Sequence, residues 1–560
     1  MYIRLAGWRT DLYIQNGTSA RPYMSQSFIC THQRHEIHLA MLQYRFFRLL
    51  IRLIMLLPAE SSMGQDVTGS APVPACITSS NRDGGSSGTV VPSHPLGIKP
   101  AGNAYTSSTN LRSTIGIFAS LPDELIIQVL EYLDSTSLLQ LGATCKAFYA
   151  FSRLEDLWKA LFIGCHPLAF EWHGSWRCTF LNIPESRSTQ IPCRNLFSDV
   201  LHRPFLCAHT PLQPYTIGIP FKNRIPRLPY LSADAFSGEW TDKPFILTET
   251  IQQWPVYRDW SMAALLEKYG ELQFRAEAVD WPLKTYDQYM NNNEDESPLY
   301  LFDRGFVEKM KIKTDKSQGG QFWTPECFGQ DLFSVLGDQR PDSRWLIVGP
   351  ERSGSTFHMD PNATSAWNAV LRGSKYWIMF PASSSLPPPP GVFVSEDQSE
   401  VTSPLSLAEW LLGFHEQARE TPGCLEGVCG EGEVLHVPSG WWHLVVNLSP
   451  SIAITQNFVP KAHLPNVLLF LRDKPEQVSG FKSEIHNPYE VFVQKMREQR
   501  CDFLDEAYRE IERIQDRRKR KWDEVVKGDA TEEDGGGAFS FGFGIGDGDD
   551  DEDADGEEFP

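Results

Sequence analysis

The chain has 560 residues, which at about 150 residues per domain predicts roughly two to four domains. Hydrophobic residues make up 41% of the sequence and aromatic residues 12%, enough for at least one large core. The formal net charge is −20, but residues 529–560 hold thirteen acidic residues and no Lys or Arg, so the rest is only mildly acidic. Because the chain has no general basic excess, we do not expect a nucleic-acid partner.

Residues 1–113 are expected to be a leader and a linker that lie outside any folded domain. Residues 59–113 are rich in Ser, Gly, Pro and Thr and show no hydrophobic period. This composition predicts a disordered linker, because such a segment cannot bury enough apolar surface to fold.

Within the leader, residues 39–58 are apolar but contain Arg45, Arg48 and Arg52. Three arginines at the centre of a membrane span would each cost about 2.5–3.5 kcal/mol, so we expect no stable membrane association. The stretch fits an interfacial or presequence-like helix, or an unstructured leader. The sequence leaves open whether residues 1–60 belong to the mature protein.

A small all-helical module is predicted over residues 114–165. The stretch Leu121–Glu124 indicates a helix start, with Pro at an early position and acids in the first turn. Apolar residues follow at helical spacing, and two more short helices complete the module. So small a unit cannot hide all of its apolar side chains internally, so the first helix is expected to face a partner. The residues concerned are Leu121, Pro122, Ile126, Ile127, Leu130 and Leu133. Packing of this face onto the rest of the chain is the alternative.

The remainder of the chain divides by composition. Residues 166–230 are Pro-rich and weakly patterned, and predict a connector. Residues 231–480 contain many short apolar or alternating strands separated by turns, which favours a closed or double-sheet β architecture. Residues 381–391 predict a surface loop inside it. A charged helical extension over 481–527 and a disordered acidic tail over 528–560 complete an α+β chain.

Eleven cysteines at irregular spacings exclude a regular disulfide framework and fit a reducing compartment. Two of them, Cys424 and Cys429, lie in a Gly-rich segment. A metal site there would need two further ligands, and the neighbouring sequence offers none. We therefore expect a loop that binds no metal.

His358 and Asp360 form the only His-x-Asp or His-x-Glu triplet of the chain. In a strand through Phe357–Asp360 the two side chains would share a face, because residues two apart point the same way. A metal needs a third ligand, and the candidates are His436 and His443. We favour His443, which follows a tight turn and opens a strand, over His436, which fits a packed strand residue.

Two histidines and one carboxylate on one face of an octahedral ion leave three positions open, which is the ligand set of non-haem Fe(II) oxygenases. Structural zinc sites close with four ligands, often cysteines, and no cysteine lies near the triplet. The open positions need an oxidisable co-substrate, commonly a 2-oxo acid. Its far carboxylate would need a buried cation, which an inward-facing Lys375 would supply. An outward, solvated Lys375 is the alternative.

Three segments around these residues resemble the JmjC-domain 2-oxoglutarate oxygenases. They are SPLYLFD (297–303), the stretch 345–381 with STFHMDPNATSAWNAVLRGSKYW, and the stretch 432–459 with GEVLHVPSGWWHLVVNL. Within that family they are most similar to the group once called phosphatidylserine receptors, the arginine demethylase and lysyl-hydroxylase type. The likeness covers about residues 231–480, and it implies a double-stranded β-helix, or cupin-like jelly roll.

The resemblance also implies a site. Fe(II) would be held by His358, Asp360 and His443, and Lys375 would pair with the distal carboxylate of 2-oxoglutarate, with O2 as the second co-substrate. The further positions that match the family's co-substrate pocket are Tyr300, Asn368, Thr455 and Asn447. The implied substrate is a lysine or arginine side chain of a protein. Whether it would be hydroxylated or demethylated stays open.

The helical module over 121–162 resembles an F-box, which docks on the adaptor of cullin-type ubiquitin ligases. The expected protein is an intracellular Fe(II)- and 2-oxoglutarate-dependent protein oxygenase with an F-box. One alternative is a ubiquitin-ligase substrate receptor whose jelly roll only binds, and another is a small-molecule oxygenase. RRKRKW (517–522) fits a nuclear localisation signal, so we favour the nucleus over the cytoplasm. A solvated helix end screened by the acidic tail is the alternative there.

Overall fold

The structure is a computed structural model of the chain, and it describes residues 91–167, 169–382, 386–396 and 399–529. Apart from residues 116–121, the described residues belong to one compact unit. The expectations for residues 39–58 and for the tail beyond 529 fall outside the described ranges. Over the described part, no single helix is long and apolar enough to cross a membrane, and one bent helix pair passes that test by length and composition only.

The predicted helical module consists of four short helices. They are α2 (Asp123–Glu131), α3 (Ser135–Gly142), α4 (Lys146–Phe151) and α5 (Glu155–Cys165). Asp134 caps α3 by accepting a hydrogen bond from Ser137 N, which satisfies one of the free amides at the helix start. The prediction gave three helices and missed α4, which lies between the second and the third.

The apolar face that we expected to meet a partner is divided between core and surface. Ile126 and Leu130 are buried inside the module, whereas Leu121, Ile127 and Leu133 are half-buried. The exposed nonpolar residues of this segment are Pro122 and two residues that the sequence analysis did not name. These are Leu125, 44% exposed, and Tyr132, 74% exposed.

The prediction of a disordered linker is wrong for residues 91–113. This segment forms η1 (Ala101–Thr106) and the start of η2 (Leu111–Ser120), and its residue Ile98 is buried. Backbone hydrogen bonds tie it to residues 193–198, with Cys193 N donating to Leu96 O at 2.7 Å. This polar stretch has few apolar residues, but it is ordered because residues 193–198 form hydrogen bonds with its backbone.

The predicted connector, 166–230, is also an ordered helical region. Its elements are α6 (Trp176–Leu181), η3 (Glu185–Arg187), α7 (Asp199–His209), α8 (Gln213–Thr216), η4 (Phe221–Asn223) and β1 (Arg227–Leu228). Trp172 and Trp176 pack against Tyr289, with ring centroids 5.0 and 5.8 Å apart, and Trp176 Nε1 donates to Asp295. The weak sequence pattern hid this region because its packing partners lie more than 100 residues away.

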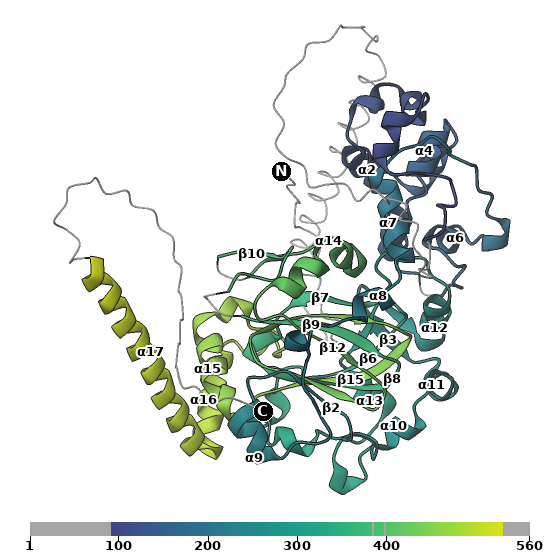
Figure 1. The fold of residues 1–560 in the computed structure, drawn as a ribbon. Helices are drawn as coiled ribbons and strands as arrows, with labels where there is room; N and C mark the ends of the chain where they lie inside the picture. Colours follow the sequence, from purple (N-terminus) through teal and green to yellow (C-terminus); the bar gives the residue numbers. More distant parts are fainter. Residues whose placement is uncertain (1–90, 168, 383–385, 397–398, 530–560) are drawn as a thin grey trace, which may run out of the picture. The chain divides into compact units, whose positions relative to one another are not determined.

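Two facing β-sheets form the predicted jelly roll (Figure 1). The larger sheet contains, in spatial order, β1, β2 (Phe245–Leu247), β13 (Val434–Val437), β8 (Ser365–Arg372), β15 (Ser451–Phe458), β6 (Arg344–Gly349), β5 (Leu301–Asp303), β3 (Gln273–Ala276) and β4 (Val279–Pro282). The smaller sheet contains β12 (Leu425–Cys429), β9 (Lys375–Pro381), β14 (Trp441–Asn447) and β7 (Gly354–His358). A hairpin of β10 (Phe393–Val394) and β11 (Val401–Thr402) follows the loop after β9.

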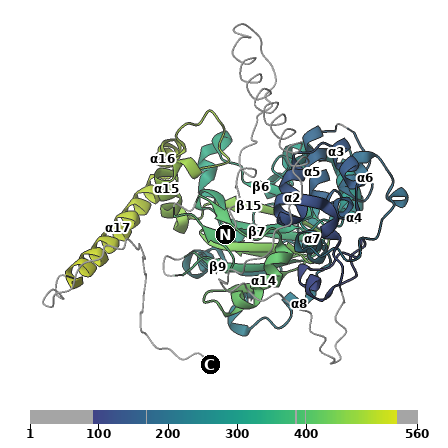
Figure 2. The ribbon, with the colours of Figure 1, turned by 90° about the horizontal axis from the view of Figure 1, so that it is seen from above.

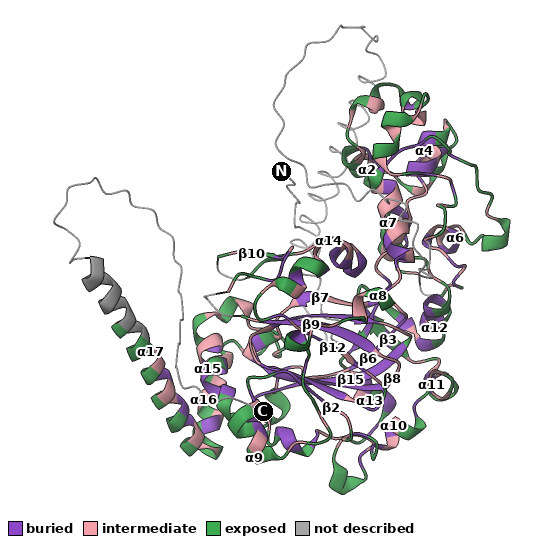
Figure 3. Ribbon diagram, viewed as in Figure 1, coloured by how far each residue is buried: buried purple, intermediate pink, exposed green. Residues whose placement is uncertain are grey.

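Both faces of the central strands are covered, which is why these strands are almost continuously apolar (Figure 3). Between the sheets, Val370 and Leu435 of the larger sheet belong to one core cluster with Trp377 and Met379 of the smaller sheet. The outer face of the smaller sheet packs under α14 (Leu407–Glu420). The segment with Cys424 and Cys429, expected as a loop, is therefore mostly strand β12, and both thiols are buried.

Helices complete the domain around the sheets. Those before β6 are α9 (Ala233–Ala235), α10 (Pro255–Asp259), α11 (Met262–Tyr269), α12 (Leu283–Asn291) and α13 (Phe306–Met310). After β15 come α15 (Leu464–Asp473), α16 (Pro488–Gln499) and α17 (Cys501–Asp529), which share one apolar core with η8 (Leu332–Gln339) (Figure 2). The basic run at 517–522 lies within α17.

Candidate active site

Two histidines lie directly opposite each other across neighbouring strands of the smaller sheet. His358 ends β7 and His443 lies in β14, with ring centroids 4.2 Å apart. His358 Nδ1 lies 2.7 Å from Thr356 O, and His443 Nδ1 lies 3.0 Å from Trp441 O. Because a carbonyl oxygen only accepts, each Nδ1 donates, which leaves the Nε2 of each ring as the atom that can bind a metal.

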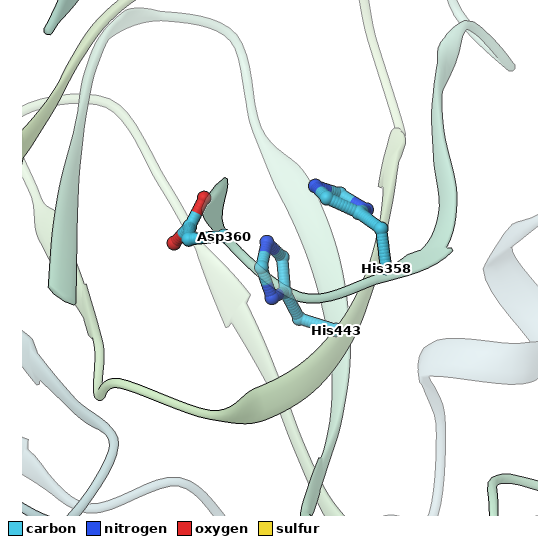
Figure 4. A group of neighbouring side chains, drawn as sticks. All are labelled: His358, Asp360 and His443. Atoms are coloured by element: carbon cyan, nitrogen blue, oxygen red, sulfur yellow. The ribbon is translucent and has the colours of Figure 1, made fainter. Parts of the chain in front are cut away.

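Asp360 joins the two histidines from a loop. The expectation that it shares a strand with His358 is wrong, because β7 ends at His358 and Asp360 precedes the short turn Pro361–Ala363. Its backbone is still extended, as a residue before proline prefers. One ligand atom from each of the three side chains lies within 4.8 Å of the others, so the triplet converges as the spacing predicted (Figure 4).

The electrostatics of this cluster fit a cation. Asp360 is partly accessible as a residue, but its Oδ2 is buried and has no hydrogen-bond partner within the described residues. Burial raises the pKa of Asp360, against the opposing effects of His358 and Asn457. Burial and the neighbouring His358 hold the pKa of His443 well below its ordinary value. A bound cation would satisfy the orphaned carboxylate oxygen and would meet a His443 imidazole whose lowered pKa favours the neutral, metal-binding form.

His436 does not take part in this cluster. It is buried in β13 among the rings of Phe236, Phe245 and Phe328, and its Nδ1 lies 3.1 Å from Lys243 O. Burial lowers its pKa to about 3. The structure therefore brings His443, and not His436, to the His-x-Asp triplet.

Lys375 points inward, so the alternative of a solvated lysine is wrong. It is fully buried at the start of β9, and its Nζ donates to Tyr300 Oη at 2.6 Å and to Asn447 Oδ1 at 2.8 Å. Over the described part of the chain, no carboxylate forms an ion pair with it. Burial lowers the pKa of Lys375 to about 7. A buried ammonium with neutral partners alone is suited to receive an anion.

The two remaining pocket positions lie opposite each other in the larger sheet. Thr455 of β15 pairs with Asn368 of β8, and Thr455 Oγ1 donates to Trp367 O at 2.8 Å. Asn368 Oδ1 is buried without a hydrogen-bond partner among the described residues. Both side chains add polar groups to an otherwise apolar interior, as expected for residues that contact a polar ligand.

The strand register sets the spacing between the lysine and the metal ligands. His443 pairs with Met379 and Asn447 pairs with Lys375, so the two levels are four residues apart on β9. Four residues of a strand span about 13 Å, which is the distance along β9 between the level of Lys375 and that of His443. The side chain of Lys375 bridges part of this distance. The remaining distance suits a short dicarboxylate that reaches from Lys375 to the metal.

Two further polar residues support the site and were not predicted. Asn457 lowers the pKa of Asp360 through a side-chain hydrogen bond and donates to Thr364 Oγ1 at 2.8 Å. Ser353 Oγ accepts from Asn447 Nδ2 at 2.9 Å. The alternation of β15 could have indicated Asn457, because it lies two residues beyond Thr455 and shares its face. Ser353 follows a turn, and no local sequence pattern indicated it.

Comparison with known proteins assigns both parts of the chain. Residues 240–463 match the cupin-like domain family and residues 118–164 match the F-box-like family. The arginine-specific demethylase JMJ22 of Arabidopsis thaliana is 35% identical over 450 residues, which cover 77% of this chain and 87% of that protein. The chain belongs to the JmjC-domain 2-oxoglutarate oxygenases. This family consists of iron- and 2-oxoglutarate-dependent enzymes. The chain also carries an F-box-like domain.

Other relatives of this JmjC oxygenase align over a smaller share of the chain. The bifunctional arginine demethylase and lysyl-hydroxylase psr-1 of Caenorhabditis elegans is 32% identical over 275 residues, 47% of this chain and 64% of that protein. The 2-oxoglutarate and iron-dependent oxygenase JMJD4 of Homo sapiens is 30% identical over 232 residues, 39% of this chain and 51% of that protein. The JmjC assignment agrees with the fold and with the donor set of the cluster.

Proposed function

We propose that this chain oxidises a C–H bond on a protein side chain, using Fe(II), 2-oxoglutarate and O2, and that its first candidate substrate is N-methylated arginine. The observation that carries the proposal is that the interior of the β domain holds both a cluster of metal-binding side chains and a buried lysine that lacks an anionic partner among the described residues. A His-Asp-His cluster with an orphaned carboxylate oxygen and a buried lysine without an anion lie about 13 Å apart along β9.

Each residue has a defined role in this reaction. His358, Asp360 and His443 would hold Fe(II) on one face and leave the other positions for ligands. Lys375 would bind the far carboxylate of 2-oxoglutarate, with Tyr300 and Asn447 fixing its amine. When bound, the metal supplies the oxidising chemistry, in which O2 and 2-oxoglutarate give CO2 and succinate and one oxygen atom enters the substrate C–H bond. The apolar walls would keep bulk water from the reacting atoms.

The choice of substrate rests on the relatives. JMJ22, named an arginine-specific demethylase, aligns over most of its length with this chain, F-box region included. Hydroxylation of an N-methyl group yields an unstable hydroxymethyl group, which releases formaldehyde and leaves the demethylated nitrogen. Hydroxylation of a lysine side chain is the second candidate, because psr-1 is named for both activities.

A direct assay separates these outcomes. The full-length protein is incubated with Fe(II), 2-oxoglutarate and peptides that carry dimethylarginine, trimethyllysine or unmodified lysine. Formaldehyde released in proportion to succinate with the methylarginine peptide supports demethylation, and a mass gain of one oxygen on lysine supports the second candidate. Succinate formation that no peptide stimulates, together with turnover of a small molecule, would point to the small-molecule alternative.

We also infer that the F-box places this activity on a cullin-type ubiquitin ligase, through the ligase adaptor. The match of residues 118–164 to the F-box-like family and the exposed Pro122 and Leu125 support this partner. In the alternative, the JmjC domain only binds proteins that the ligase modifies. A variant His443→Ala that still recruits the same proteins to the adaptor, with unchanged ubiquitylation, would favour that alternative.

The basic run RRKRKW at 517–522 supports a nuclear location. A fluorescent reporter fused to residues 505–528 should accumulate in the nucleus, and replacement of the five cations by glutamine should abolish accumulation. A wild-type reporter that stays cytoplasmic would favour the alternative of a solvated helix end.

A further inference from the structure

An aromatic pair lies on the wall of the β domain and has no part in holding the metal or the co-substrate. Phe302 of β5 and Trp345 of β6 stack with ring centroids 5.3 Å apart and an interplanar angle of 29°. Trp345 is half-buried, and Phe302 is 40% exposed. A single exposed phenylalanine is ordinary in a protein. What distinguishes this one is its stacking on a tryptophan beside the candidate active site.

Both rings belong to the interior side of the larger sheet. Phe302 pairs with Ile347 and Trp345 pairs with Thr455, and residues that pair across strands share a face. Trp345 also packs on the cluster of Tyr300, Ile347 and Ala453. Tyr300 Oη accepts a hydrogen bond from Lys375, which belongs to the opposite sheet, so this cluster lies between the two sheets.

The register also places Trp345 near the metal ligands. Trp345 is one strand away from Thr455, which lies two residues from Asn457, the hydrogen-bond partner of Asp360. One strand spacing of about 5 Å and two residues of about 7 Å put the Trp345 and Asn457 backbones about 8–9 Å apart. Trp345 therefore lies on the wall of the site, between the level of Lys375 and that of the metal ligands, and Phe302, one strand farther out, makes the pair accessible.

We propose that Phe302 and Trp345 form the subsite for the substrate side chain, and that this subsite selects a flat or N-methylated cation. This inference rests on the proposed function for its assignment to a protein side chain. An aromatic face carries negative charge density and attracts weakly hydrated cations, of which a guanidinium is a good example. Methyl groups on the cation weaken its hydration further and add apolar contact with the ring. The subsite thus favours methylated arginine over neutral side chains.

The decisive experiment measures binding without turnover. Full-length protein is loaded with Mn(II) and 2-oxoglutarate under anaerobic conditions, and the Kd of a dimethylarginine peptide is compared with that of the same peptide carrying citrulline, which is neutral. Phe302→Leu removes the π face but keeps apolar volume, and Phe302→Tyr keeps the face. Phe393→Leu, at an aromatic residue that is 74% exposed on the β10–β11 hairpin, is the matched control.

We expect Phe302→Leu to raise the Kd of the dimethylarginine peptide about three- to thirty-fold, the range of a cation–π contact. Phe302→Tyr and Phe393→Leu should change it less than about two-fold, and the citrulline peptide should bind weakly to every form. Equal affinity of the Leu and Tyr variants, or equal binding of citrulline and dimethylarginine, would overturn the subsite. A matching thermal midpoint of all three variants shows that the fold is intact.

Failure of the proposed function gives a different pattern. If the methylated peptide binds, depends on the Phe302 ring, and yields neither formaldehyde nor a hydroxylated product under Fe(II) and O2, then the subsite stands and the proposed reaction is wrong. If the peptide is demethylated and Phe302→Leu leaves its Kd unchanged, then the reaction stands and the subsite is wrong. If no cationic peptide binds, the subsite is overturned.

Discussion

Lys375 and Asn447 lie directly opposite each other across β9 and β14, and Lys375 Nζ donates a 2.8 Å hydrogen bond to Asn447 Oδ1. Asn447 is itself held in place, because its Nδ2 donates to Ser353 Oγ at 2.9 Å. Since the amide nitrogen is used in that bond, the amide oxygen must face the lysine. The protein therefore fixes a buried cation with neutral groups only, and leaves its charge to be balanced by a ligand.

The first prediction concerns Lys375→Met, which keeps apolar volume and removes the charge. We expect the KM for 2-oxoglutarate to rise at least about 30-fold, because the partner of a desolvated carboxylate is lost. The thermal midpoint of the metal-free protein should change little, because the relief of a buried charge offsets the loss of the hydrogen bonds to Tyr300 and Asn447. Steady-state assays and thermal melts measure both. Lys222→Met, at an exposed lysine, is the control and should change neither. An unchanged KM in Lys375→Met would assign the anchor to another cation.

The second prediction is a pH dependence of co-substrate binding. Burial lowers the pKa of Lys375 to about 7, so the free protein holds a neutral amine above that pH. Binding of a dicarboxylate favours the protonated form, and above pH 7 the proton must be taken up from solution. The affinity for 2-oxoglutarate should therefore fall as the pH rises from 7 to 9, at most tenfold per pH unit. Anaerobic titrations at several pH values measure this slope. Lys375→Met should flatten it, and a flat profile in the wild type would contradict the prediction.

The convergence of His358, Asp360 and His443 could be predicted because the signal is local in the sequence. One His-x-Asp triplet exists, and the preference for His443 rested on its place after a tight turn at the mouth of a strand. The structure gives the physical reason why His436 differs: it fills a space among three phenylalanine rings. The assignment of Asp360 to a strand was wrong, although its backbone is extended. The sequence can indicate an extended backbone, but it does not show whether a neighbouring strand forms hydrogen bonds with that residue.

Order in residues 91–113 and 166–230 could not be predicted, because it depends on long-range packing. Trp172 and Trp176 gain their partners from residues near Tyr289, and the backbone of Lys99 bridges to Phe197. Neither pairing leaves a periodic pattern in the local sequence. Local patterning alone therefore marked as linker two segments whose apolar residues follow no period and pack against distant parts of the chain.

The third prediction tests the metal ligands by stability. Fe(II) or Mn(II) should raise the thermal midpoint of the wild type, and a chelator should reverse the rise, because a ligand that binds only the folded state stabilises it. Asp360→Ala and His443→Ala should abolish both this shift and turnover. Asp360→Ala should not lower the midpoint of the metal-free protein, because it removes a carboxylate oxygen that is buried without a partner.

A matched histidine serves as the control for that experiment. His436→Leu should lower the midpoint, since the ring is packed in the core and Nδ1 loses its contact with Lys243 O, but it should preserve the metal-induced shift. Loss of the shift in His436→Leu at full folding, with retention in His443→Ala, would reverse the assignment of the third ligand.

The fourth prediction concerns the F-box surface. Pro122 and Leu125 are exposed at the start of α2, whereas Ile126 and Leu130 are buried under them. If the exposed face docks on the ligase adaptor, then Pro122→Ala/Leu125→Ala should abolish adaptor pull-down, with little change in thermal midpoint or in 2-oxoglutarate turnover. Leu130→Ala should instead destabilise the module by about 2–5 kcal/mol, because it opens a cavity in its core.

The contrast between these variants separates docking from internal packing. Under docking, the surface variant loses the adaptor while its fold persists, and Phe221→Ala, at an exposed apolar residue outside the module, binds as the wild type does. If the face instead packs on the rest of the chain, the surface variant would lose stability to a similar extent as Leu130→Ala, and the wild type would fail to retain the adaptor. Because the exposed and the buried residues alternate within one turn of α2, the two outcomes test neighbouring side chains on the same helix.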